Sequence, residues 1–231
     1  MRRKFAILGL GHFGLNLCLH LMQRNCEVLA IDIDEERVEK VRDRVSHAMI
    51  LDTSDKRALS GLGLEEMDAV VVAIGENFEA SLLTTAHLQE MSVKNIINRV
   101  MSPVHERLLK LMKVDSLILP EGDAAFQLSR KMTMTGVVDG LELTKDYSII
   151  EVGVPKKFVG KKLEELNLRK NYQLNLITVM RLSGDGSEML TLGERPQVEV
   201  LGIPTNDLIF DEKDILVLFG REKHLKSFIE A

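Results

Sequence analysis

A glycine-rich turn between an apolar run and a helical stretch constrains the fold of this chain more than any other feature. The apolar run at 5–8 leads into Gly9-Leu10-Gly11-His12-Phe13-Gly14, a leucine-rich helical stretch follows, and a second apolar run ends at Asp32. This order of strand, turn, helix, strand and acid is the context that makes a G-x-G-x-x-G pattern specific. It predicts a phosphate-binding turn in a doubly wound α/β domain.

Each glycine of the turn has a mechanical reason. Gly9 permits the tight turn, Gly11 lets phosphate oxygens approach the backbone, and Gly14 lets the helix pack close to the sheet. The helix beginning near Phe13 directs unpaired N–H groups and its positive end at the phosphates. Asp32 would accept hydrogen bonds from ribose hydroxyls and repel a 2′-phosphate, so NADP is disfavoured. The alternative is a glycine turn that only shapes an empty domain.

The composition excludes several classes of protein. The chain has 231 residues, 45% of them hydrophobic, enough for one large or two small globular domains. A net charge of −5, with no basic cluster flanked by aromatic residues, argues against a nucleic-acid partner. Apolar runs such as 69–74 fall far short of the roughly 20 residues that cross a bilayer, and the N-terminus has the pattern of a core strand. We therefore expect a soluble, cytoplasmic protein.

Cysteine and histidine usage gives no sign of a disulfide framework, a zinc site or a catalytic base. Cys18 and Cys26 stand alone and suit a reducing compartment, and we expect Cys18 to pack as a small apolar residue. The histidines outside the glycine turn have no carboxylate or cysteine at ligand spacing, so we interpret them as surface or packing residues. They are His20, His47, His87, His105 and His224.

Short β-rich runs alternate with helix-periodic stretches from Lys4 to about Leu119. Strands are predicted at 5–8, 28–31, 48–51, 70–74, 96–100 and 117–119. Helices are predicted at 35–44, 81–91 and 105–113, with Asp34 capping the first, Ser102-Pro103 starting the last and Pro120 stopping the sixth strand. This alternation predicts a Rossmann-like, doubly wound parallel sheet.

The pattern changes after Pro120. An amphipathic segment at 123–135 precedes strands at 149–154, 174–181, 189–192, 198–201 and 215–219, with helices at 160–168 and 222–229. We expect two domains, a Rossmann-like one at 1–136 that includes the crossover helix and a smaller α+β one at 137–231. The predicted fold class is therefore α/β with a second, smaller α+β domain.

The order of several short motifs resembles that of the regulators of potassium conductance, the RCK or KTN family. The motifs are the glycine turn, Asp32 and Asp34, Asp52-Thr53-Ser54, Ala73-Ile74-Gly75, Arg99 and Pro120-Glu121. The stretches 159–166 and 214–220 look like the C-terminal half of the same family. The resemblance covers essentially the whole chain. It is strongest with the cytoplasmic regulatory subunits of Ktr-type potassium uptake systems, with the Trk type next.

This resemblance implies a regulator and not an enzyme. In such proteins the N-terminal domains pair into homodimers, and the dimers assemble into a ring, usually an octamer. The ring docks beneath an integral-membrane potassium-transporting subunit at the inner face of the cell membrane. Exchange of ATP against ADP, or of NADH against NAD, changes the ring shape and gates potassium flow. Such gating requires the two ligands to bind the two ring shapes with different affinity.

The resemblance also implies a set of nucleotide-binding residues. They are Gly9, Gly11, His12, Phe13, Gly14, Asp32, Asp34, Asp52, Thr53, Ser54, Ala73, Ile74, Gly75, Arg99 and Glu121. The glycine turn would cradle phosphates, the two acids after the second strand would hold the ribose, and 52–54 would border adenine. Glu121 would lie near the dimer partner's nucleotide and help to bind a divalent cation, Mg²⁺ or Ca²⁺. The alternatives are a strand-end charge for Arg99 and a helix N-terminal carboxylate for Glu121.

His12 departs from the pattern of the family. Ktr-type regulators usually have arginine in this position, where it reaches the terminal phosphate across the dimer, whereas histidine is only partly charged near neutral pH. Our hypothesis is that His12 still contacts phosphate and makes nucleotide affinity depend on pH. The alternative is that His12 only caps the helix or faces solvent.

Two further functions follow from parts of the sequence. A small NAD-dependent oxidoreductase would use the same first domain, but it needs an acid or base beside the nicotinamide, which the β-rich second domain does not supply. In some Ktr-type relatives the second domain binds cyclic di-AMP between two copies. That resemblance implies contacts from Asn175, Arg181 and Pro204, although 195–201 looks like extra sequence.

Overall fold

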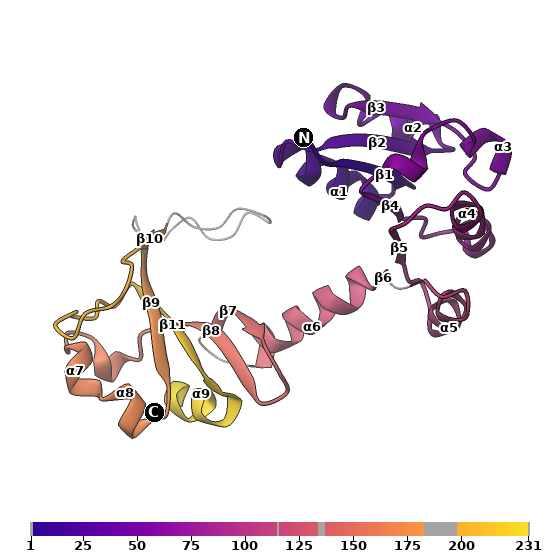
Figure 1. Cartoon of the computed structure of the whole chain (residues 1–231). Helices are drawn as coiled ribbons and strands as arrows, with labels where there is room; N and C mark the ends of the chain where they lie inside the picture. Colours follow the sequence, from indigo (N-terminus) through magenta and orange to yellow (C-terminus); the bar gives the residue numbers. More distant parts are fainter. Residues whose placement is uncertain (1, 115, 134–136, 183–197, 231) are drawn as a thin grey trace. The chain divides into compact units, whose positions relative to one another are not determined.

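The computed structural model describes residues 2–114, 116–133, 137–182 and 198–230 of the chain (Figure 1). Its internal contacts divide it into two units, Met1–Asp123 and Ala124–Ala231. The division falls inside helix α6 (Pro120–Thr133), whereas the predicted domain boundary lies after that helix, at 136/137. Each unit is described by itself below.

The first unit is built on six parallel strands in the order β3-β2-β1-β4-β5-β6. The strands are β1 (Lys4–Leu8), β2 (Glu27–Asp32), β3 (His47–Ile50), β4 (Ala69–Val72), β5 (Ile96–Arg99) and β6 (Ser116–Ile118). Ile7 pairs with Ala30 on one side and with Val71 on the other, so β1 is central. The chain runs outward from β1 in one direction and then starts again at β4, which creates a switch point between these two strands. The doubly wound parallel sheet predicted from the sequence is confirmed.

Helices cover both faces of this sheet. They are α1 (His12–Gln23), α2 (Glu35–Glu39), α3 (Lys56–Leu59), α4 (Phe78–Glu90) and α5 (Pro103–Leu111), with 3-10 turns η1 (Arg42–Arg44) and η2 (Leu64–Glu66). On one face Ile7 shares a core with Cys18 of α1, and on the other Leu8 shares a core with Leu88 of α4. Alternate residues of β1 therefore face opposite layers, as a strand buried on both sides requires. Cys18 packs as a small apolar residue, as predicted.

Caps and packing together decide where the helices begin and end. Asp34 starts α2 by accepting hydrogen bonds from the N–H groups of Glu36 (2.8 Å) and Arg37 (3.3 Å). The prediction of one helix at 35–44 is wrong, because α2 stops at Glu39 and η1 follows. The N–H of Val41 donates to the carbonyl of Val38, and both valines are fully buried. Packing on the sheet thus overrides the helical propensity of the charged stretch.

The second unit contains a five-stranded antiparallel sheet in the order β10-β9-β11-β8-β7. The strands are β7 (Val137–Glu142), β8 (Tyr147–Gly153), β9 (Asn175–Leu182), β10 (Val198–Val200) and β11 (Asp214–Arg221), and the helical segments are η3 (Lys156–Phe158), α7 (Leu163–Leu166), α8 (Leu168–Asn171) and α9 (Glu222–Ile229). Its core packs Ile150 and Leu218 of the sheet against Phe158 and Phe228. The α+β character predicted for this part is confirmed.

Three local predictions for the second unit have different outcomes. The single helix predicted at 160–168 is wrong, because Asn167 adopts a left-handed conformation (φ 44°) that separates α7 from α8. Strand β7 begins before the region in which the sequence indicated strands. The strand predicted at 189–192 lies outside the described residues.

In the part of the chain that the structure describes, no helix is both long enough and apolar enough to span a membrane.

Candidate functional site

A cavity of about 420 Å³ opens at the carboxyl ends of the parallel strands, around the switch point between β1 and β4. Open α/β sheets bind their ligands at this place. The cavity brings together most of the residues singled out by the sequence. These are Gly9, Gly11, His12, Asp32, Asp52, Thr53, Ser54, Ala73, Ile74, Gly75, Arg99 and Glu121.

The glycine turn forms one wall, and steric requirements explain two of its glycines. Gly9 has φ +101°, and a Cβ there would lie 2.8 Å from the backbone nitrogen of Ile74. A Cβ on Gly14 would overlap the carbonyl oxygen of Gly9. A Cβ on Gly11 would meet nothing within 4 Å, so this residue is open toward the cavity. The turn is therefore packed behind and exposed in front, where a phosphate would approach.

Helix α1 begins at this wall. Gly11 is its N-cap and provides no side-chain hydrogen bond, and the first turn carries no acidic residue. Among the described residues, no capping side chain pairs the first N–H groups of this twelve-residue helix, and no acidic side chain of the first turn neutralises its positive end. His12, the first helical residue, is exposed and lines the cavity. An anionic group in the cavity would meet both features.

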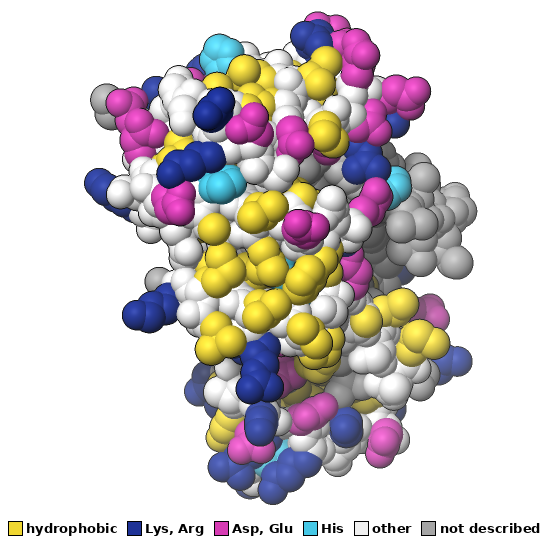
Figure 2. Space-filling model, turned by 90° about the vertical axis from the view of Figure 1, so that its right-hand side faces the viewer, with side chains coloured by type: hydrophobic (Ala, Val, Ile, Leu, Met, Phe, Trp, Pro, Cys, Tyr) yellow, Lys and Arg dark blue, Asp and Glu magenta, His cyan; other side chains and the backbone are white. Residues whose placement is uncertain are grey.

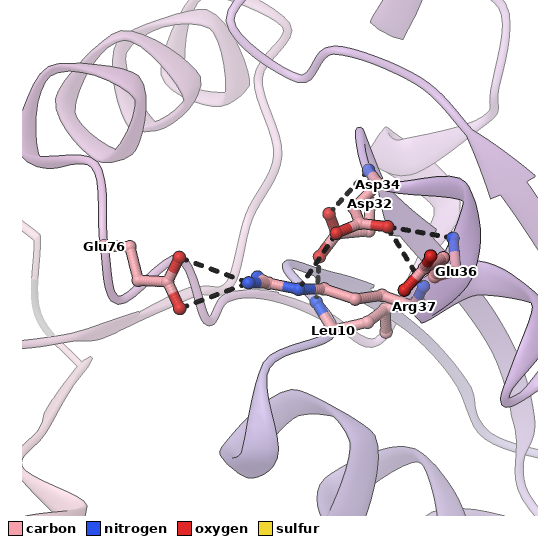
Figure 3. A network of polar contacts seen from close by, with 6 residues as sticks. All are labelled: Leu10, Asp32, Asp34, Glu36, Arg37 and Glu76. Atoms are coloured by element: carbon pink, nitrogen blue, oxygen red, sulfur yellow. Dashed lines mark hydrogen bonds and ion pairs between the residues drawn. The ribbon is translucent and has the colours of Figure 1, made fainter.

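Asp32 ends β2 and is held firmly by backbone groups. Its Oδ2 accepts from the N–H of Leu10 (2.5 Å) and its Oδ1 from the N–H of Asp34 (2.9 Å), as Figure 3 shows. Only 7% of the residue is exposed. A carboxylate has about four lone-pair sites, so two remain for hydroxyl donors in the cavity. The geometry suits a group that hydrogen-bonds a ribose.

The loop after β3 forms the opposite wall and is fastened to α4. Asp52 Oδ1 accepts from the backbone N–H (2.9 Å) and the hydroxyl (2.6 Å) of Ser54, and these bonds hold the pKa of Asp52 below its usual value. The Thr53 hydroxyl lies 2.9 Å from that of Thr84, and His87 Nε2 lies 3.0 Å from the carbonyl oxygen of Ser54. No local sequence pattern indicates this role for Thr84 or His87, because only the fold places α4 beside the loop.

Arg99 and Glu121 form an ion pair at the far end of the cavity. Arg99 ends β5, and Glu121 lies in the first turn of α6. The guanidinium packs against Gly75, where any Cβ would overlap it, and its Nε is buried without a partner among the described atoms. The positive charge expected at this point is therefore present but already balanced by a carboxylate.

Glu121 belongs to no cluster of potential metal ligands in the part of the chain that the structure describes. Among the residues that the structure describes, no three histidine, cysteine, aspartate or glutamate side chains are grouped so that they could hold an ion. Its carboxylate is engaged with Arg99. A divalent cation here would therefore need ligands beyond the residues of this chain that the structure describes.

Three of the expected binding residues do not line the cavity. Phe13 packs into the core beneath α1, and Gly14 is buried behind the turn. Asp34 caps α2 and lies near the cavity rim, where its Oδ2 is 3.5 Å from Nε of Arg37. Direct contacts from these residues to a nucleotide stay predictions, and the structure gives each of them a part in shaping the turn or the rim.

The cavity also contains residues that the sequence did not single out. They are Ile31, Ile33, Arg37, Leu51, Glu76, Asn77 and Ala80. Ile33 is 66% exposed although it is apolar, which suits a flat face for a ring system next to the ribose acid. An exposed apolar residue after a strand looks like a continuation of that strand in the sequence. The contacts of Arg37 with Glu76 join segments 39 residues apart, and no local pattern indicates them.

The second unit has a cavity of about 380 Å³, and it brings together only part of the expected set. Asn175 and Pro204 line it, and Arg169 donates to Asn175 Oδ1 from Nε (3.1 Å) and Nη2 (2.8 Å). Arg181 is elsewhere: its Nε and Nη2 donate to the two oxygens of buried Asp214 at 2.6 and 2.8 Å. A role for cyclic di-AMP stays a prediction, without Arg181 among the residues that line this cavity.

Comparison with protein families and sequences gives consistent matches. The model of the TrkA-N domain matches residues 5–120. The Ktr system potassium uptake protein C of Bacillus subtilis (strain 168) is 33% identical over 228 residues, covering 99% of this chain and 96% of that protein. The Ktr system potassium uptake protein A of the same organism is 31% identical over 226 residues, covering 98% and 95%.

Comparison with solved structures supports the same two-part fold. The GsuK channel bound to NAD superposes with a TM-score of 0.62 at 18% sequence identity, over 99% of this chain and 39% of the channel chain. The present chain thus spans about two fifths of that channel. At this identity the likeness establishes the fold alone.

Proposed function

The chain belongs to the family of regulatory subunits of Ktr- and Trk-type potassium uptake systems, and on this premise we propose that it senses an adenine nucleotide and gates a potassium-transporting membrane subunit. The observation that carries the proposal is the cavity at the switch point of the parallel sheet. There an uncapped helix N-terminus and a buried, backbone-held carboxylate face the same space. These are the two groups that an adenosine phosphate requires.

The ligands proposed for this cavity are ATP and ADP or NADH and NAD. All four contain an adenosine phosphate. We expect Asp32 to bind its ribose and the turn at Gly11 to bind its phosphate. The alternatives differ in the groups beyond that part. We expect His12, at the first position of α1, to contact these distinguishing groups, because it is exposed and lines the cavity.

Assembly with further copies is proposed as the step that transmits nucleotide exchange to the transporter. Figure 2 shows hydrophobic side chains gathered on the face that α4 and α5 turn toward the viewer. Exposed apolar residues of these helices are Leu83 (41%), Val104 (65%) and Leu111 (71%). Apolar surface of this kind favours burial between subunits. The ring would bind the inner side of the membrane through its potassium-transporting partner.

The mechanism requires a difference in affinity between two assembled states. A nucleotide that binds both states equally shifts nothing, however tightly it binds. A terminal phosphate or a nicotinamide charge must therefore contact groups that are arranged differently in the two states. The exposed His12 and the Arg99–Glu121 pair line the cavity, and we expect such a difference to act on them.

The test is a thermal-shift comparison of ATP, ADP, NADH, NAD and AMP on the purified protein. A ligand that binds only the folded state raises the melting temperature by mass action. We expect a shift with one of the two nucleotide pairs and its loss in Asp32→Ala, with Asp43→Ala as the matched control on the exposed surface. The absence of a shift with every nucleotide, or an equal shift in Asp32→Ala, would overturn the proposal.

Gating needs a separate test. The protein is expressed with a Ktr-type membrane subunit in cells that lack other potassium uptake, and potassium flux is measured in vesicles loaded with each nucleotide. Flux that depends on the nucleotide and on intact Asp32 is the expected result. Flux that is the same with every nucleotide would contradict the regulatory role while leaving nucleotide binding intact.

A further inference from the structure

An arginine near the ribose acid is held by two carboxylates. Arg37, in α2, donates from Nη2 to both oxygens of Glu76, each at 3.2 Å. Its Nε lies 3.5 Å from Oδ2 of Asp34. Figure 3 shows Arg37 reaching from the side of Asp32 and Asp34 toward Glu76. Because Arg37, Glu76 and Asp32 all line the same cavity, this pair lies beside the place proposed for the ribose.

The position of Arg37 is the one from which a cation would meet a 2′-phosphate. In dinucleotide-binding folds an acid at the end of the second strand accepts hydrogen bonds from the ribose 2′-hydroxyl, whereas a nearby arginine accommodates a 2′-phosphate. A guanidinium suits that task because its planar donors match phosphate oxygens in pairs. This chain carries both groups, Asp32 and, five residues later, Arg37. An acid alone therefore does not settle which ribose the site accepts.

The carboxylates around Arg37 decide whether this arginine is available to a 2′-phosphate. Its pKa is raised above the usual value, chiefly by the hydrogen bond with Glu76, and Asp32 and Asp34 add to that effect. Three carboxylates thus act on one guanidinium, and the strongest contact comes from a side chain outside the strand-helix segment that carries the acid. Glu76 itself is 79% exposed at the side chain, so no core packing requires a glutamate there.

We propose that Glu76 is a specificity-determining residue, which holds Arg37 and so denies a 2′-phosphate the cation that it would need. The inference rests on the proposed nucleotide function and deepens it. The site then accepts adenine nucleotides with a free 2′-hydroxyl and rejects those with a 2′-phosphate. Asp32 repels the additional phosphate, and Glu76 removes the compensation that Arg37 would otherwise offer.

The proposal is tested by calorimetric titration with two small ligands that differ only in the 2′-phosphate, 5′-AMP and adenosine 2′,5′-bisphosphate. Titrations use the full chain at one fixed ionic strength, since salt screens such contacts. The quantity compared is the dissociation constant of the bisphosphate divided by that of 5′-AMP. The variants are Glu76→Gln, Arg37→Gln, the double variant, and Glu79→Gln as a control. Glu79 is exposed, lies three residues away and does not line the cavity, so the control makes the same charge change.

We expect the unaltered protein and Glu79→Gln to share a ratio that favours 5′-AMP. In Glu76→Gln this ratio should fall about tenfold, so that the bisphosphate binds relatively better. This is the size expected when one unit charge is removed beside Arg37. The double variant should lose that gain. An unchanged ratio in Glu76→Gln, or a gain that persists without Arg37, would overturn the inference while AMP binding keeps the proposed function intact. Failure of the unaltered protein to bind either ligand would instead overturn the proposed function itself.

Discussion

The cavity of the first unit and the cavity beside Asn175 in the second differ in what the fold leaves available to a ligand. In the first, parallel strands end at one edge, and the N-cap Gly11 of α1 leaves helix N–H groups without a side-chain cap among the described residues. In the second, the antiparallel sheet sets no such edge, and Arg169 hydrogen-bonds the neighbouring Asn175. A binding site thus needs polar groups that the fold holds in position but leaves without hydrogen-bond partners.

The largest expected effect comes from replacing one glycine in each unit by a residue with a Cβ. A Cβ at Gly14 would overlap the carbonyl of Gly9, whereas a Cβ at Gly153 of β8 would meet nothing within 4 Å. We expect Gly14→Val to lower the free energy of unfolding by about 3 kcal/mol and to abolish nucleotide binding. Gly153→Ala should stay within about 0.5 kcal/mol. Urea unfolding measures both, and equal losses would show that the turn is not sterically demanding.

The second prediction concerns a buried carboxylate of the second unit that is paired with an arginine. Asp214 is buried and accepts from Arg181 and from the backbone N–H of Asp211 (2.8 Å). Replacing Asp214 with alanine leaves these donors unmatched and should cost about 2 kcal/mol of stability. Nucleotide affinity should not change, because neither residue of the pair lines the first unit's cavity. Glu212→Ala, at an exposed position of the same loop, is the control, and a matching loss in that variant would refute a specific role for the pair.

The third prediction concerns Asp32, the carboxylate that we expect to bind the ribose. In Asp32→Asn one carboxylate oxygen becomes an amide donor that faces backbone N–H groups and ribose hydroxyls. Loss of a charged acceptor should weaken nucleotide binding about tenfold, or about 1.4 kcal/mol. Isothermal titration of the favoured nucleotide measures this, with Asp43→Asn as the control. Undiminished affinity in Asp32→Asn would mean that the ribose lies elsewhere.

The smallest expected effect is a pH dependence of the first unit. His105 is fully buried, its Nδ1 accepts from the N–H of Met101 (3.2 Å), and burial lowers its pKa below the ordinary 6.5. The unfolded chain therefore takes up a proton at a higher pH than the folded one. The stability contribution is fully present above about pH 6.5 and declines as the pH falls toward the folded pKa. Urea midpoints between pH 8 and pH 5 should show this decline, and it should flatten in His105→Asn. The same slope in that variant would assign the effect to another group.

Local sequence patterns predicted those features of the first unit that depend on residues close together in the sequence. The glycine turn, the cap at Asp34 and the alternation of strands and helices all depend on short-range patterns, and the structure has each of them. Patterns failed where distant packing decides the outcome. The helix at 35–44 is cut short because Val38 and Val41 are both buried on the sheet.

The same distinction explains which site residues were found. Asp32 was predicted because its distance from the glycine turn is a sequence signal. Arg37 and Glu76 were missed because their contact joins helix α2 to the segment after β4, and only the fold brings these two together. Arg181 was expected near a ligand, but Asp214, 33 residues further along the chain, engages it. Sequence alone cannot show which charged groups are already paired.

The most direct test of the central claim is hydrogen–deuterium exchange of the full chain with and without the favoured nucleotide. Bound ligand should protect backbone amides near the glycine turn (9–15), the rim at 32–37 and the loop at 52–54. The segments around the second cavity, 163–176, should show the smaller change. Strong protection at 163–176 with none at 9–15 would contradict the account, because it would place the nucleotide in the second unit.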